Sequence, residues 1–329
     1  MNTKSKNYKD FQSKEIFIDG LNASFFLNPN VFRNLKKGNV TAVNGTIAAW
    51  HNFTETMEMI GSLMTILDAS KDSIFLVERA VDIVDAKRTG RTGFIMGFQD
   101  TAPLEGKLYT LRLFQKLGIR VIQLTYNTTN LVGSGFMTKD EGITSFGQEV
   151  IEEMNRLGIL IDISHCGEKT SAMAVEISVK PLAVTHANPY SFCPHPRNKS
   201  DSVLKAVAKK GGVVGINAFP AMLKTSGQAS LEDYLNAIDY TVNLIGIDHT
   251  ALGPDFMEEM PNEIADIVLK DVPAEMREKM KKMPALKNFE SISKAPEVTD
   301  GLFRRGYSED EVRKIIGLNW LHLYEEVWR

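Results

Sequence analysis

The stretch FGQEVIEEMNRLGILIDIS, residues 146–164, joins one amphipathic segment to one apolar segment. In residues 146–157 the apolar side chains fall on one stripe of a helix and the acidic side chains face away from it. Gly158 follows where a glycine commonly ends a helix. Residues 158–164 form a continuous apolar run of strand length, which is typical of a parallel strand buried on both faces. The stretch therefore predicts a helix followed by a buried parallel strand.

This alternation recurs along most of the chain. Eight runs are predicted as strands: 15–20, 39–47, 92–98, 119–125, 158–164, 181–185, 212–218 and 249–253. Helical patterns lie between them, at 55–69, 104–117, 146–157, 168–178, 201–210 and 231–245. Eight strands alternating with helices in about 250 residues predict an α/β fold of the (β/α)8 TIM-type barrel class. A doubly wound open sheet ranks second, because it uses fewer strands and no GxGxxG turn follows any of these runs.

No linker or repeat divides the sequence, so we expect one barrel domain over residues 1–329. Residues 256–292 are rich in Met and charge, and we predict a helical excursion over the barrel mouth there. Residues 299–329 predict two extra C-terminal helices, SEDEVRKIIG with Ser308 as its N-cap and then LNWLHLYEEVW.

Composition excludes several classes of function. The chain has 329 residues and a net charge of −3, so nothing indicates a nucleic-acid partner. The apolar runs are too short to span a bilayer, the N-terminal segment has no signal core, and the C-terminal segment has no anchor tail. Cys166 and Cys193 are the only cysteines, which suits a reducing compartment. We expect a cytoplasmic protein with no membrane partner.

Two histidines end adjacent predicted strands. His165 follows the fifth strand, His186 follows the sixth, and Asp255 follows the eighth. In a barrel of this class the active site lies at these strand ends. Neutral imidazoles suit a transition metal, and a carboxylate across the mouth can act as base toward water. The alternative is that each histidine is a hydrogen-bonded structural residue.

The loop NPYSFCPHPRN, residues 188–198, follows the sixth strand and ends in Arg197 and Asn198. A guanidinium on a proline-rich loop beside the predicted site is suited to bidentate binding of a substrate carboxylate. The alternative is a solvated surface arginine.

Four segments together resemble the membrane (renal) dipeptidase family of zinc hydrolases. They are ITSFGQEVIEEMNRLGILIDISHCG at 143–167, PLAVTHANPYSFCPHPRNKSDSVLKAV at 181–207, LGPDF at 252–256 and RRGYSEDEVRKIIGLNWLHLY at 304–324. The resemblance implies an amidohydrolase-type barrel with a two-zinc site. By this resemblance, His165 and His186 match two zinc ligands of the family. Asp255 matches the aspartate that acts as acid and base, and Arg197 matches the arginine that holds the substrate carboxylate. Tyr126 stands where the family has a histidine that polarises the scissile carbonyl.

The chain departs from the family pattern at three metal-ligand positions. Leu21 and Ala23 replace the His-x-Asp pair after the first strand, and Gln99 replaces the bridging Glu. An amide is a poor metal ligand, so a two-zinc centre is not expected. We expect at most one divalent metal, held by His165 and His186 with Gln99 as a weak further ligand. The resemblance implies that this metal is zinc. Asp100 could supply a carboxylate only if a bulge turned it inward.

Three functions therefore remain. The first is a metal-dependent dipeptidase of this family, an enzyme acting in proteolysis on a small substrate that bears a carboxylate. In this reading Asp255 and Tyr126 are catalytic, and Arg197, Tyr126 and Asn198 bind substrate. The second is a divergent enzyme on the same barrel that acts on a carboxylate substrate other than a dipeptide. The third is a metal-free, inactive binding protein. The resemblance also implies a homodimer.

Overall fold

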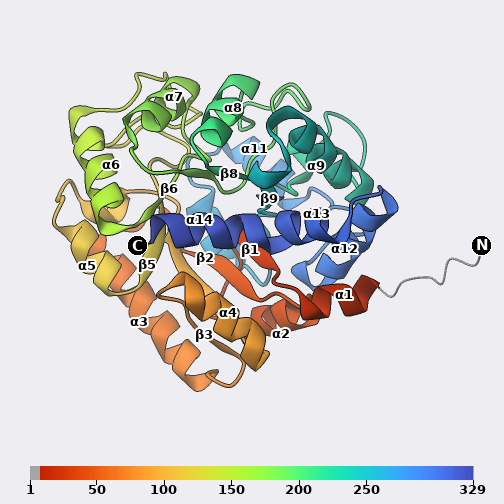
Figure 1. Ribbon diagram of the computed structural model, residues 1–329. Helices are drawn as coiled ribbons and strands as arrows, with labels where there is room; N and C mark the ends of the chain where they lie inside the picture. The colour runs from red at the N-terminus through yellow and green to blue at the C-terminus, as the bar shows by residue number, and fades with distance from the viewer. Residues whose placement is uncertain (1–7, 329) are drawn as a thin grey trace, which may run out of the picture.

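The computed structural model describes residues 8–328, and its central feature is a parallel sheet curved into a nearly closed barrel (Figure 1). Eight strands follow one another around it: β1 (Ile18–Asn22), β2 (Ala42–Ala48), β4 (Thr92–Phe98), β5 (Ile119–Gln123), β6 (Leu160–Asp162), β7 (Ala183–Val184), β8 (Val213–Ile216) and β9 (Thr250–Leu252). Beyond the end of β9, the Asp255 amide donates to the Leu21 carbonyl (3.0 Å) and the Ala23 amide to the Phe256 carbonyl (2.8 Å). The predicted barrel class is confirmed.

Each of the eight predicted strand runs contains an observed strand, and each predicted helical pattern contains a helix. The helices around the barrel are α2 (Pro29–Lys37), α3 (Phe53–Ala69), α4 (Ala80–Thr89), α5 (Thr110–Lys116), α6 (Ser145–Leu157), α7 (Glu168–Ile177), α8 (Asp201–Lys209) and α9 (Leu231–Ile245). The predicted patterns did not include α1 (Tyr8–Lys14), α2, α4 or the short strand β3 (Ile74–Leu76), which pairs with the first residues of β4. The ends of the predicted domain, residues 1–7 and 329, lie outside the described residues.

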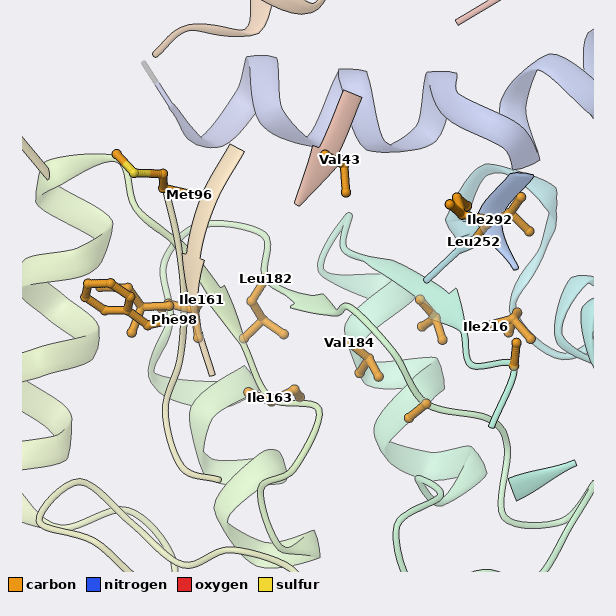
Figure 2. Packing of buried hydrophobic residues seen from close by; sticks show 14 of the residues in the cluster. Val43, Met96, Phe98, Ile161, Ile163, Leu182, Val184, Ile216, Leu252 and Ile292 are labelled. Atoms are coloured by element: carbon orange, nitrogen blue, oxygen red, sulfur yellow. The ribbon is translucent and has the colours of Figure 1, made fainter. Parts of the chain in front are cut away.

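The strands carry apolar side chains on both faces, as a barrel requires. Side chains on the outer face, including Met96, Ile161 and Val184, pack beneath the helices (Figure 2). Side chains on the inner face near the strand starts, including Ile18 and Leu160, form a second cluster. Because both faces are filled, the polar side chains gather at the strand ends.

The C-terminal helix α14 (Asn319–Val327) crosses the strands in the middle of Figure 1 and closes the amino-terminal end of the barrel. Trp320 is fully buried in the inner cluster, and its indole N–H donates to the Leu252 carbonyl (2.9 Å). A Cβ on Gly20 would lie 2.5 Å from this indole, so only glycine lets the ring approach β1. The opposite end of the barrel is therefore the open one.

Helices α12 (Ala295–Arg304) and α13 (Glu309–Arg313) precede α14, and Ser308 caps α13 as expected. The predicted break after Gly317 is wrong, because residues 314–318 form one π-helical turn that continues into α14. A Cβ at Gly317 would lie 2.2 Å from the Ile16 carbonyl. This glycine thus permits close packing of the helix against the start of β1 and does not end the helix.

Residues 256–292 contain two helices, α10 (Asn262–Val268) and α11 (Ala274–Lys281). The Trp50 indole N–H, after β2, donates to the Val268 carbonyl at the end of α10 (3.0 Å). Ile264 and Val268 share a cavity with Tyr126, which follows β5. Helix α10 therefore lies over the strand ends. Among residues 8–328, no helix is long and apolar enough to cross a bilayer.

Candidate active site at the strand ends

Two buried histidines face each other at the open end of the barrel. His165 lies just beyond β6 and His186 just beyond β7, and their Nε2 atoms are 2.9 Å apart. Parallel pairing of β6 with β7, through Asp162 and Ala183, brings these two positions together. Both imidazoles are buried.

The outer nitrogens of both rings are held by neighbours that assign the tautomers. Nδ1 of His165 lies 2.8 Å from Oδ1 of Asn127, a pure acceptor, so this nitrogen carries the proton. The Thr185 hydroxyl donates its one proton to Asp162 (2.7 Å) and therefore accepts from Nδ1 of His186 (2.7 Å). Both Nε2 atoms are then unprotonated and present lone pairs to each other.

Such a pair needs a proton or a cation between its two nitrogens. Burial, with the charge of Arg197 adding to it, holds the pKa of both His165 and His186 well below the usual range, which disfavours the proton at neutral pH. Two nitrogens bound to one tetrahedral zinc at about 2.0 Å are about 3.3 Å apart. A separation of 2.9 Å is close to this distance, and histidines held at Nδ1 by oxygen acceptors are the usual form of metal ligands. The donor pair fits one cation.

Tyr126 covers one side of the His165 ring. The two rings stack with centroids 4.2 Å apart and planes inclined by 22°, and Trp50 packs edge-on against the tyrosine at 4.9 Å. Burial raises the pKa of the Tyr126 phenol well above its ordinary value. The hydroxyl therefore stays protonated at neutral pH and can donate a hydrogen bond.

Asp255 stands beyond β9 in a strained backbone conformation. Its φ is +63°, a left-handed value that few residues other than glycine adopt, and Asn217 donates to its Oδ2 (3.1 Å). Nearby, a Cβ on Gly253 would lie 1.8 Å from the Thr185 carbonyl, so this glycine lets the chain beyond β9 pass close to the end of β7. Burial raises the pKa of Asp255 to about 6, although Arg197 and Asn217 counteract the rise. The carboxylate can thus exchange a proton near neutral pH.

Arg197 is buried behind the histidines and joins their two strand ends. Its guanidinium donates to the Ser164 carbonyl and to the His186 carbonyl (3.0 Å). Burial lowers its pKa only to about 10, so it remains charged at neutral pH. Asn198 does not face this site, because its amide donates to the Cys193 and Met222 carbonyls and accepts from the Asn188 amide. Asn198 instead fixes the shape of the loop.

The positions of the replaced family ligands offer no comparable donors. The Leu21 side chain is buried and Ala23 lines a cavity, while the Gln99 amide donates to the Thr46 hydroxyl (2.8 Å). Asp100 accepts hydrogen bonds from the backbone amides of Tyr126 and Ala102 (both 2.6 Å). Both of its carboxylate oxygens thus stabilise the loops after β4 and β5. Residues 8–328 contain no group of three or more His, Cys, Asp or Glu side chains able to hold a metal. These positions therefore add no imidazole or carboxylate donor to the histidine pair.

Two cavities flank the site beneath α10 and share Met260. One, of about 210 Å³, is lined by Ala23, Gln99 and Tyr126 together with apolar side chains. The other, of about 370 Å³, is lined by Asp255 and by residues of the 256–290 segment. A small molecule at the histidine pair therefore has room on both sides.

Sequence reasoning missed the residues that orient the candidate groups. Asn127, Asp162 and Thr185 set the two imidazoles, and Asn217 sets Asp255. Each of them lies at or just beyond the end of a predicted strand, so the rule that pointed to the histidines could have found them. Lys199 was also missed; it is buried and donates to the Cys166 carbonyl and to the Ser171 hydroxyl (3.0 Å).

The sequence of this chain matches a family of known proteins. Residues 11–287 match the family model described as membrane dipeptidase, peptidase family M19. Dipeptidase tcpJ of Claviceps purpurea is 28% identical over 277 residues, which are 83% of this chain and 60% of that protein. The chain thus spans about three fifths of this relative's length.

Solved structures extend the comparison to the fold. The crystal structure of an amidohydrolase from Pseudomonas aeruginosa is 34% identical, with a TM-score of 0.93 over 98% of this chain and 99% of that chain. A metallo peptidase from Rhodobacter sphaeroides, crystallised with a phosphinate mimic of the dipeptide L-Ala-D-Ala, is 21% identical, with a TM-score of 0.82 over 96% and 100% of the two chains. At that identity the second likeness concerns the fold alone.

Proposed function

Because this chain belongs to the membrane dipeptidase family, we propose that it hydrolyses the amide bond of a dipeptide-type small molecule that bears a carboxylate. We propose further that His165 and His186 hold a single divalent cation, zinc by the chemistry of imidazole ligands. The observation that carries the proposal is the pair of facing Nε2 atoms 2.9 Å apart. Within residues 8–328, no second set of donors of this kind supports a second ion.

The cation would supply Lewis acidity, lowering the pKa of a bound water to about 7. Asp255, with a pKa of about 6, is deprotonated at neutral pH and can take the proton of the attacking water. The same carboxyl group can then return that proton to the leaving amine. Its strained backbone and the Asn217 hydrogen bond hold it in one orientation for both transfers.

Tyr126 and Arg197 act on the substrate's oxygens in this proposal. The protonated Tyr126 hydroxyl donates to the carbonyl oxygen as negative charge develops on it. Arg197 keeps its charge and has N–H groups beyond the two that bind backbone carbonyls, so it can also bind the substrate carboxylate. Asn198 contributes by keeping the arginine loop rigid.

A dipeptide panel with matched metal analysis tests the proposal. Protein reconstituted with one equivalent of zinc should hydrolyse at least one L-L or L-D dipeptide and lose the activity with a chelator. The absence of any turnover while zinc is bound would contradict the dipeptidase assignment and favour a different carboxylate substrate.

A second candidate, a metal-free binding protein, has one observation in its favour. Residues 8–328 contain no cluster of three metal-binding side chains, and three protein ligands are usual for catalytic zinc. Failure to bind zinc under any condition would favour this candidate. The cytoplasmic location and the homodimer stay predictions from the sequence and the resemblance.

A further inference from the structure

We propose that the cavity of about 210 Å³ beside Ala23 receives an aromatic or branched alkyl group of the substrate, which makes this chain selective for apolar substrates. The inference rests on the proposed function, because the apolar group belongs to a substrate only if the chain is a hydrolase. The ligand class of the cavity itself can be tested without any hydrolysis.

The cavity wall is mainly apolar, and its polar members are Ser24, Thr46, His51, Gln99 and Tyr126. Its apolar members include Phe25, Phe26, Ile47, Met59, Leu63 and Phe94. The Gln99 amide donates to the Thr46 hydroxyl across the wall (2.8 Å), so these two polar groups bind each other. A cavity lined mainly by apolar side chains favours apolar guests.

The volume matches a ring. An engineered apolar cavity of about 150 Å³ binds benzene, and a cavity of about 210 Å³ has room for a fused bicyclic ring such as indole. Close-packed interiors contain few voids larger than a water molecule, so a cavity of this size at a strand end is not ordinary packing.

The cavity adjoins the candidate catalytic groups through one shared wall. Tyr126 lines the cavity with one part of its ring and stacks on His165 with a face (4.2 Å). A substrate amide beside His165 therefore has the cavity within reach of an attached side chain. Trp50 fixes helix α10 over the cavity by donating to the Val268 carbonyl, so the roof is anchored.

The sequence departures explain why the cavity is apolar. Ala23 lines it where the resemblance implies a metal-binding carboxylate, and Gln99 lines it where the resemblance implies the bridging Glu. A charged metal centre in these positions would make this wall polar. Replacement of the ligands thus converts one half of a metal site into a side-chain pocket.

The first test measures binding of indole by calorimetry and the position of xenon in pressurised crystals. We expect xenon in the cavity and saturable indole binding that falls at least tenfold in Ala23→Leu and in Ala49→Leu, which fill the space. Ala69→Leu is the matched control, since Ala69 is exposed at the end of α3. Circular dichroism verifies that each variant is folded. An empty cavity in the wild type, with no indole binding, overturns the inference whatever the activity.

The second test compares kcat/KM for Phe-containing and Ala-containing dipeptides. We expect the wild type to prefer the aromatic substrate at least tenfold and Ala23→Leu to lose most of this ratio, because each methylene accommodated in an apolar pocket changes the rate 10- to 200-fold. An unchanged ratio in both filling variants overturns the substrate role. If no dipeptide is cleaved while indole still binds in the cavity, the proposed function fails and the apolar ligand class stands.

Discussion

Removing the acceptor that fixes the His165 tautomer should weaken metal binding without removing a ligand. In Asn127→Ala the His165 Nδ1–H loses its partner, which lies 2.8 Å away in the wild type. The proton is then free to occupy Nε2, the nitrogen that faces His186 at 2.9 Å. Loss of such an orienting partner typically lowers metal affinity 10- to 100-fold. This corresponds to about 1.4–2.7 kcal/mol.

The assay is a zinc titration in competition with a chromophoric chelator at pH 7.5. Thr185→Val makes the equivalent change at His186, whose Nδ1 is 2.7 Å from the Thr185 hydroxyl, and should weaken binding by a similar factor. Asn243→Ala is the matched control, since Asn243 is exposed on α9. Wild-type zinc affinity in folded Asn127→Ala and Thr185→Val would refute the claim that these two imidazoles are the ligands.

Three further perturbations test the rest of the site. Asp255→Asn should lower kcat at least 100-fold. In the wild type kcat/KM should rise with pH up to about 6, where the Asp255 carboxylate ionises. Asn217→Ala should shift this rise in kcat/KM to higher pH, because it removes a hydrogen bond that lowers the pKa of Asp255. Identical pH profiles of kcat/KM in the wild type and in Asn217→Ala would contradict the assignment of Asp255 as the base. Burial lowers the pKa of Lys199 to about 8, so the unfolded chain binds more protons above that pH and stability should rise between about pH 8 and 10.5. Lys199→Met should abolish this rise, which is worth about 3 kcal/mol, in denaturant unfolding of the metal-free protein. Gly253→Ala should destabilise the fold by about 3 kcal/mol in the same assay, since its Cβ would lie 1.8 Å from the Thr185 carbonyl; a change below 1 kcal/mol would contradict the close approach.

The barrel could be predicted because its periodic signal is repeated eight times. Buried strands such as Thr92–Phe98 are continuous apolar runs, and helices such as Leu231–Ile245 carry an apolar stripe, so local pattern and global fold agree. The strand Ile74–Leu76 has only three residues and no pattern distinguishes it from a loop. The predicted helix break after Gly317 is wrong because this position is glycine for a tertiary reason. It packs against the Ile16 carbonyl, which no local pattern encodes.

The candidate ligands and the groups that orient them differ in how visible they are in a sequence. His165, His186 and Asp255 belong to residue types with distinctive chemistry at predictable strand ends. Asn127 and Thr185 are common residue types. Asn127 reaches His165 only because the chain beyond β5 lies beside the chain beyond β6, and Thr185 accepts from its neighbour His186 because Asp162 on β6 takes the hydroxyl proton. The apolar cavity could not be foreseen either, since it requires the packing of residues on or just beyond four strands, together with α3 and α10, around one volume.

The zinc content of the purified protein tests the central claim most directly. Elemental analysis of the wild type after zinc supply and dialysis should give one equivalent per chain, and His165→Ala should give none while keeping the fold. His322→Ala, which alters an exposed histidine on α14, should keep the full equivalent. Zero equivalents in the wild type, two equivalents, or full occupancy in His165→Ala would each contradict a single cation held between His165 and His186.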